Sequence, residues 1–201
     1  YHEIFLPRIA RITADGLPDP SFRPGNGADN NVHSVAVQSN GSLLIGGNFT
    51  SYDATNRAGI ARVLANGKLD LTFNPGSGFS GYVNEVIALA NGQILAGGAF
   101  TNFNGAARNG LVRINGDGSL DTSFTAPFET AAVVKEIKVQ ADGQIVAVGS
   151  FALTGANGRR NAVRLNADGS LDGTFGSSSL NSGPAGIVNA VEICSDGTFI
   201  V

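Results

Sequence analysis

The chain has 201 residues, of which 42% are apolar and 14% charged, a composition typical of a folded domain with a substantial core. The formal net charge of −3 provides no basic field for phosphates, so nucleic acid is not an expected partner. No apolar run approaches the ~18 residues that span a membrane, and the single cysteine, Cys194, excludes an intramolecular disulfide framework and a cysteine-rich zinc site.

A segment of eight residues recurs along the chain at intervals of 51 residues. The four copies are DGLPDPSF at 15–22, NGKLDLTF at 66–73, DGSLDTSF at 117–124 and DGSLDGTF at 168–175. A second turn of Asn-Gly or Asp-Gly begins at residues 40, 91, 142 and 196, the last copy three residues late. Self-similarity at a fixed period indicates a repeat architecture.

Four short strands are expected in each repeat, because β-forming residues are interrupted about every ten residues by hairpin turns. In chain order, the first complete copy places these strands at residues 32–38, 42–49, 58–64 and 68–73. No segment carries a sustained 3.6-residue apolar period, so helices are not expected. The longer connections are rich in Gly, Asn, Ser and Pro and are expected to be loops.

The second hairpin of each repeat predicts an ion pair. With three residues such as 14–16 in the turn, position 11 faces position 19 and position 12 faces position 18. This register places apolar residues opposite apolar ones and arginine opposite aspartate in every copy. The expected ion pairs are Arg11–Asp19, Arg62–Asp70, Arg113–Asp121 and Arg164–Asp172. Because the pair recurs in all four copies, we expect its role to be structural.

Four strands in about 50 residues are typical of one blade of a β-propeller. We therefore predict an all-β fold of four-stranded antiparallel blades in a single domain, residues 1–201. The two terminal strand pairs complement one another, which gives about four blade equivalents and allows a closing blade. A larger ring of which these blades are a part, and an open stack, are the alternatives. Because the chain begins with Tyr1 and contains no methionine, we expect it to derive from a longer polypeptide.

Three parts of the repeat carry a family resemblance. They are GGNFT at 46–50, RAGIAR at 57–62 and the eight-residue segment at 66–73, with close equivalents at 97–101, 108–113 and 117–124. They resemble the delta-sixty repeat family of bacterial β-propellers, over essentially the whole chain. The resemblance implies a large secreted or cell-surface bacterial protein and supplies no catalytic residues. Residues 1–7 depart from the pattern, so an irregular first blade is expected.

No motif in the sequence predicts catalysis, a cofactor or a metal site. The histidines, His2 and His33, occupy no repeated position and no Gly-x-Ser-x-Gly elbow, and Cys194 is expected to be an inert thiol. The glycine-rich run at 76–81 precedes a strand and not the helix that a dinucleotide site needs. Segments 115–121 and 166–172 lack the first acidic ligand and the closing glutamate of an EF-hand, so turns are expected there.

The connections after the second and fourth strands of each repeat are expected on one face of the fold, the loop face. Loops that differ between repeats are the expected location of function. Five aromatic residues lie in or beside these connections: Tyr52, Phe79, Tyr82, Phe103 and Phe128. Flanked by Asn and Ser, they are expected to be exposed and to contact a protein or a glycan. The alternative is that they cap the core.

Three functional hypotheses follow from this sequence. The first is a noncatalytic module of a bacterial surface or secreted protein that binds a protein or a glycan in adhesion. The second is a polysaccharide-acting lyase or hydrolase that uses the central channel and needs convergent carboxylates or a histidine in one copy only. Against it, Glu85 and Glu136 are equivalent by the 51-residue period. The third is a passive spacer in a large adhesin, and fold alone does not decide among them.

Overall fold

The computed structural model describes residues 8–129, 131–153, 159–176 and 183–201. Throughout these residues the regular secondary structure is β, with no helix. Three-stranded antiparallel sheets form the body of the molecule. The first sheet contains β1 (Val32–Val37), β2 (Leu43–Gly47) and β5 (Ile60–Val63); the second contains β6 (Tyr82–Ala88), β7 (Ile94–Ala99) and β10 (Leu111–Ile114); the third contains β11 (Val133–Val139), β12 (Ile145–Ala152) and β13 (Arg160–Leu165).

Short hairpins accompany these sheets. They are β3 (Ser51–Tyr52) with β4 (Thr55–Asn56), β8 (Asn102–Phe103) with β9 (Ala106–Ala107), and β14 (Glu192–Ile193) with β15 (Phe199–Ile200). The first two hairpins lie in connections that the sequence predicts as loops. The third occupies the positions of the first two strands of a fourth sheet, after allowance for the three-residue insertion.

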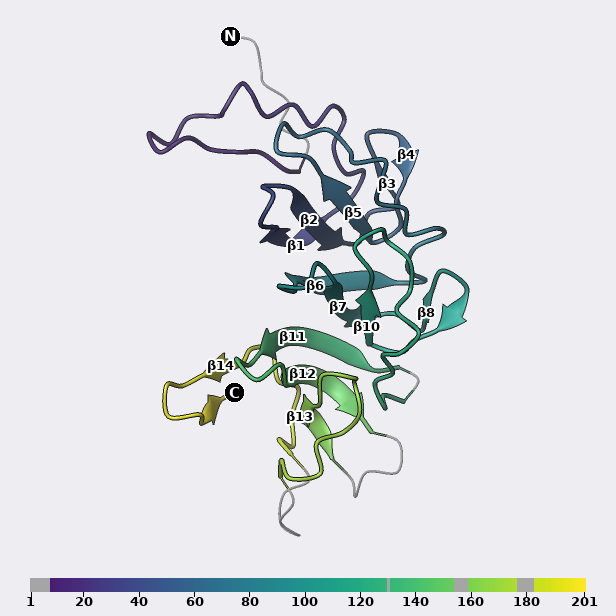
Figure 1. Ribbon diagram of the computed structural model, residues 1–201, viewed down its shortest axis with the longest axis vertical. Coiled ribbons are helices and arrows are strands. Elements are labelled where there is room, and N and C mark those ends of the chain that lie inside the picture. The colour runs from purple at the N-terminus through teal and green to yellow at the C-terminus, as the bar shows by residue number, and fades with distance from the viewer. Residues whose placement is uncertain (1–7, 130, 154–158, 177–182) are drawn as a thin grey trace.

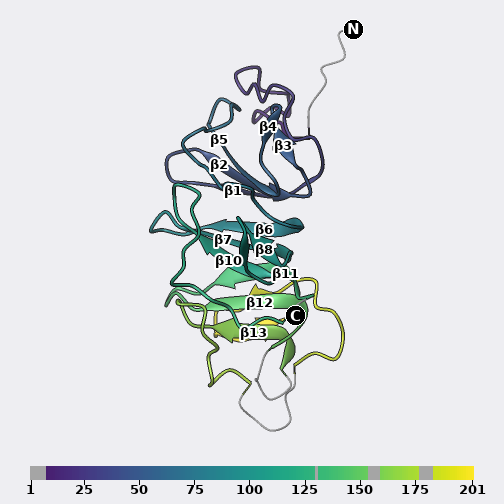
Figure 2. The ribbon, with the colours of Figure 1, turned by 90° about the vertical axis from the view of Figure 1, so that its right-hand side faces the viewer.

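The sheets stack face to face along one axis, in the order of the chain (Figures 1 and 2). Strands β1 and β2 contact β6, and β6 and β7 contact β11. Residues 8–23 lie at one end of the stack, and β14–β15 lie beside the third sheet at the other end. In the described part of the chain, the two terminal strand pairs therefore form no closing blade. The intervening sheets hold them apart, and the fold is an open stack.

The expected fourth strand of each repeat is reduced to a single bridge. Val63 pairs with Leu69, as the predicted register requires, and the same bridge recurs at Ile12–Pro18, Ile114–Leu120 and Leu165–Leu171. Asp70 ends the pairing, because its Oδ1 accepts a hydrogen bond of 2.9 Å from the backbone N–H of Thr72. This Asx turn bends the chain away from the extended conformation. The prediction of a regular strand at 68–73 is therefore wrong, although the position of the segment is correct.

The first strand of each three-stranded sheet carries a β-bulge, and from the second sheet onward a side chain of the preceding sheet accepts a hydrogen bond from the backbone at this position. The register shifts between Val83 and Glu85 in β6, and equivalent shifts occur in β1 and β11. The backbone N–H of Val86 then donates to Ser34 Oγ at 3.1 Å. Equivalent bonds join Ile137 N–H to Glu85 and Val191 N–H to Glu136. The sheets are thus held together by polar contacts as well as by apolar packing.

The hydrophobic core consists of layers between successive sheets. Because both faces of an interior sheet are covered, the second strands are apolar apart from Ser150 in β12, and most of their residues are buried. At the closest approach the sequence uses glycine. A Cβ atom on Gly97 would lie 2.7 Å from Ile137 Cδ1 and 2.8 Å from Val134 Cγ1, so a larger residue requires these two side chains of β11 to move.

Candidate functional site

All four expected Arg–Asp pairs are present, with N–O distances of 2.6–2.8 Å. Each arginine does more than pair with its aspartate. Arg62 also donates to Thr72 Oγ1 at 3.0 Å, lies 5.1 Å from the ring centroid of Phe73, and donates to the carbonyl of Gly116 in the next repeat. In the first three copies the arginine therefore fastens one repeat to the next.

The aspartates of this motif are held in their charged form. Hydrogen bonds from Thr174, with the Arg164 guanidinium, lower the pKa of Asp172 to about 2. Burial raises the pKa of Asp121, but the Ser123 and Arg113 hydrogen bonds outweigh it and lower the value to about 2. A carboxylate whose acceptors are all engaged in every repeat is a component of the architecture and not a binding site.

Four of the five loop aromatics are buried. Tyr52, Phe79, Phe103 and Phe128 are at most 6% exposed. The expectation that they are exposed is wrong, because the β3–β4 and β8–β9 hairpins fold over the sheet ends and bridge to the preceding connection at Ala28–Tyr52 and Phe79–Phe103. The Tyr52 hydroxyl donates to the carbonyl of Gly67 at 2.7 Å.

Tyr82 is half-buried and packs edge-to-face against His33, with ring centroids 6.0 Å apart. His33 Nδ1 lies 3.0 Å from the carbonyl oxygen of Val83, so this imidazole is engaged between two sheets. The four buried rings correspond to the alternative in which the aromatics cap the core, whereas Tyr82 packs on the exposed His33 side chain.

The loop face changes its chemistry in the third sheet. There a hollow of about 570 Å³, which we call the loop-face hollow, lies between the ends of β12 and β13 and the preceding connection. Its polar lining consists of Glu129, Ser150, Arg160 and Asn161, together with Arg159. The side chains of Glu129 and Arg160 are exposed, and no hydrogen bond or ion pair to another described residue engages them.

Glu129 occupies a position that is structural in the earlier repeats. The equivalent Asp29 accepts hydrogen bonds from Thr50 N–H at 2.8 Å and from Thr50 Oγ1 at 2.6 Å. Burial raises the pKa of Asp29, but these bonds and those from Ser51 lower it to about 2. The equivalent Ser80 accepts from Thr101 N–H at 3.2 Å. In the third repeat Ala152 stands in place of the threonine, so the carboxylate of Glu129 is released into the hollow.

Asn161 is a second departure from the repeat. It has φ of 66°, a left-handed conformation that Gly59 and Gly110 adopt at the equivalent positions. Its Oδ1 accepts from Phe151 N–H at 3.1 Å and its Nδ2 donates to the carbonyl of Pro184 at 2.9 Å. Non-glycine residues in this region are uncommon and cluster at functional sites. The sequence shows this substitution in the 51-residue alignment, although the loop aromatics were the residues singled out.

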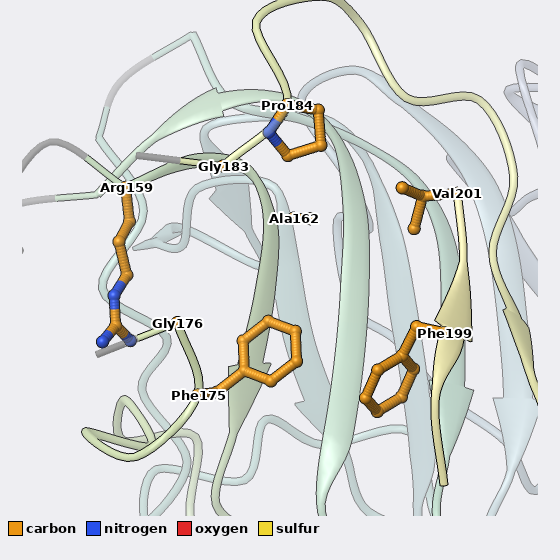
Figure 3. Close-up of a pocket in the computed structure, with 8 residues that line it drawn as sticks. All are labelled: Arg159, Ala162, Phe175, Gly176, Gly183, Pro184, Phe199 and Val201. Atoms are coloured by element: carbon orange, nitrogen blue, oxygen red, sulfur yellow. The ribbon is translucent and has the colours of Figure 1, made fainter. Parts of the chain in front are cut away.

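A second cavity, of about 510 Å³, lies between the third sheet and the β14–β15 hairpin (Figure 3). Phe175 and Phe199 line it and pack edge-to-face, with ring centroids 5.4 Å apart. Arg159 lies at its edge, and its guanidinium donates to the carbonyl of Asp172 at 3.0 Å. This cavity is a continuation of the space between sheets, and its chemistry is largely apolar.

Two further acidic side chains, Glu85 and Glu136, lie between the sheets. Burial raises the pKa of Glu85 to about 7, and this carboxyl accepts from the backbone of Ile137. Glu136 pairs with Lys138 at 2.8 Å. Within the described ranges no group of three or more His, Cys, Asp or Glu side chains is placed to hold a metal ion. His2 lies outside the described residues.

In the segments 115–121 and 166–172, which were compared with an EF-hand loop, the turns are closed by hydrogen bonds made by their own side chains. Asp117 Oδ1 accepts from Ser119 N–H at 2.9 Å and from Ser119 Oγ at 2.7 Å, and Asp168 makes the same contacts with Ser170. These are the contacts of Asx turns, as expected for a hairpin.

The stacked antiparallel sheets, joined by a repeated Arg–Asp motif, define an all-β repeat protein of the β-propeller class. A family model described as "Domain of unknown function (DUF5122) beta-propeller" matches residues 6–22, 38–73, 89–124 and 140–175, and the chain belongs to this family. A search of curated proteins found no match. Over the described residues, no helix is long and apolar enough to cross a membrane.

Proposed function

We propose that this chain is a noncatalytic binding module of a bacterial surface or secreted protein, and that the loop-face hollow holds a polar group of a glycan or a protein. The observation that carries the proposal is the release of Glu129. The same position fastens the loop to the sheet in the first two repeats, through Asp29 and Ser80. A side chain that no longer contributes to the fold, exposed in a hollow, is available to a ligand.

The polar groups of the hollow are complementary in kind. The Glu129 carboxylate accepts hydrogen bonds, whereas the Arg160 guanidinium donates them. A sugar hydroxyl is able to donate to the first and accept from the second, and a protein surface with mixed charges offers the same groups. Charge-assisted hydrogen bonds are the stronger kind, and the hollow of about 570 Å³ has the size of a ligand site.

Location outside the cell is supported by the resemblance to delta-sixty repeats, which are typical of large secreted or surface proteins. Labelling of intact cells of the source bacterium with an antibody against this chain tests it. Signal on intact cells is expected, and signal that appears only after lysis contradicts it.

Binding is tested with a glycan array and a pull-down from surface extracts, using the wild-type chain and two variants, Glu129→Ala and Arg160→Ala. Both residues are exposed, so each variant is expected to fold and to lose the ligand. Lys68→Ala, an exposed charge at a tight turn of an earlier repeat, is the matched control and is expected to bind normally. Equal binding by all variants would place the ligand elsewhere, and no ligand in either assay would favour the passive spacer.

A further inference from the structure

One apolar contact recurs at each interface between successive sheets. A residue in the second strand of one sheet shares a core layer with two residues in or just before the first strand of the following sheet. The three examples are Leu44 with Val83 and Val86, Leu95 with Val134 and Ile137, and Val146 with Val188 and Val191. Each example follows from the previous one by the repeat period, including the three-residue insertion in the last.

In the next contact of this series, the second-strand residue lies at the C-terminal end of the stack and the two first-strand residues lie at the N-terminal end. The residue equivalent to Leu44 is Ile200 in β15, which is 67% exposed. The residues equivalent to Val83 and Val86 are Val32 and Val35 in β1, and Val35 is 53% exposed. Two exposed apolar side chains thus occupy positions that are partners everywhere else in the molecule.

A second series, in the third strands, leads to the same pairing of ends. Ile60 and Phe73 are covered by Val112 and Ile114 of the next sheet. Leu111 and Phe124 are covered in the same way by Val163 and Leu165.

In the last described repeat, the equivalent residues Ala162 and Phe175 line the cavity of about 510 Å³ shown in Figure 3. The residues that continue the covering series lie at the other end of the stack. They are Ala10 and Ile12, of which Ile12 is 53% exposed.

The backbone offers a matching strand edge. In the third sheet, β12 pairs with β11 on one side and with β13 on the other. In the described residues, β15 pairs only with β14. Residues 9–12 hold the third-strand position, as Ile60–Val63 do in the first sheet, so they fit the second edge of β15. The pairing of Ala147 with Val163 then predicts that Val201 faces Ala10.

We propose that a second copy of this chain docks head-to-tail on the C-terminal end of the stack. Residues 9–22 of the incoming copy add a strand to β15 and fill the cavity beside Phe175, and Val35 of that copy packs on Ile200. The interface continues the contacts already present between sheets, with the same residue types in the same register. Because its two faces are different, the contact is heterologous and generates a ring or a filament, not a closed two-fold dimer.

Sedimentation of the 201-residue chain over a range of concentrations tests the proposal. Wild-type protein is expected to grow beyond the mass of two chains. Val35→Asp removes one face and Ile200→Asp the other, so each variant alone is expected to remain at the mass of one chain. Both side chains are exposed, and folding should survive the changes. Leu71→Asp, an exposed apolar position within the stack, is the control and should assemble like the wild type.

A mixture of the two variants separates this contact from a symmetric one. Each variant retains one intact face, so the mixture is expected to form pairs and nothing larger. Monomeric wild-type protein at all concentrations overturns the proposal and leaves a further repeat of a longer polypeptide as the occupant. A wild-type dimer that never grows, or a mixture that stays monomeric while the wild type assembles, overturns it too.

Cross-linking tests the predicted register directly. In a Cys194→Ser background, Ala10→Cys and Val201→Cys in one chain should give disulfide-linked oligomers on mild oxidation, because opposite residues of paired strands lie within disulfide range. Leu71→Cys with Val201→Cys is the control and should remain unlinked. Equal cross-linking of both pairs contradicts the register.

Discussion

At the residue scale, the clearest feature is the Glu85 carboxyl group, which lies between two sheets and is partly shielded from solvent. Glu85 accepts a hydrogen bond from Ile137, and burial nevertheless raises its pKa to about 7 from an ordinary value of 4.5. The Glu136 charge opposes ionisation as well, while Lys138 favours it. The aspartates of the Arg–Asp motif have the opposite behaviour, because their pKa values are lowered.

Stability is therefore expected to fall as the pH rises from about 4.5 to about 7. In this interval the unfolded chain releases the Glu85 proton before the folded chain does, so the unfolded state gains relative stability. The aspartates are ionised in both states there and add no slope. Urea unfolding at pH 5 and pH 8 should show a loss on the order of 1–2 kcal/mol after discounting for solvent. Glu85→Gln should remove that slope, and an unchanged slope would assign it to another group.

A second residue-scale prediction concerns the tight turns of the small hairpins. Ala54 has φ of 61°, whereas the equivalent Gly105 has φ of 82°. A left-handed conformation costs an L residue with a Cβ about 1 kcal/mol more than glycine. Ala54→Gly should therefore raise the free energy of unfolding by about 1 kcal/mol, measured by urea denaturation. The reciprocal Gly105→Ala should lower it, since nothing lies within 4 Å of the added Cβ to compensate.

At the scale of elements, the hairpin that carries the Arg–Asp pair acts as a connector between repeats. The contribution of its Arg–Asp pair to stability depends on how deeply the pair is buried, and this burial differs between copies. The Arg113–Asp121 pair is largely shielded, and Asp121 also accepts from Gln93 Nε2 at 2.8 Å. The Arg11–Asp19 pair is much more open to solvent. The same motif is thus expected to have unequal effects along the stack.

Asp121→Ala is expected to destabilise the protein by roughly 3 kcal/mol, because it leaves the shielded Arg113 without its partner. Asp19→Ala should have a much smaller effect. The difference should shrink as the pH falls from about 4 towards 2, where the wild-type carboxylate becomes protonated. Thermal unfolding of both variants checks this, and binding at the loop-face hollow should be retained. An unchanged melting temperature for Asp121→Ala would contradict a structural role.

At this scale, the sequence predicted the contacts between residues that are close in the chain and missed those between residues that are far apart. The Arg–Asp register follows from a single turn, and the partners are eight residues apart, so turn geometry was sufficient. The burial of Phe79 depends on its bridge to Phe103, a non-local contact that composition does not reveal. Glu129 was missed because it lies two residues earlier within a connection of unchanged length, which shifts it out of the 51-residue register. Asn161 stayed in register, and its replacement of glycine was the readable signal.

At the scale of the whole molecule, the stack is a linear array in which each sheet contacts only its neighbours. Stability in such arrays is approximately a sum of repeat and interface terms. The second sheet shares core layers with sheets on both sides, whereas β14–β15 pair over only two residues each. The repeat period determines the structure of one repeat, but it does not determine the angle between successive repeats. The number of repeats alone therefore could not show that the stack stays open and lacks a closing blade.

Hydrogen exchange should therefore be graded along the axis. The backbone amides of β7 are expected to exchange most slowly, because exposing them requires the loss of two interfaces, and those of β14–β15 most rapidly. The measurement is best made by mass spectrometry on Val35→Asp at low concentration, so that contacts between copies do not protect the ends. In the wild type at high concentration, protection of β15 and of residues 9–12 should rise together if copies dock head-to-tail. Equal protection of all sheets in the variant would mean that the stack unfolds as one cooperative unit, and nearest-neighbour additivity would not apply.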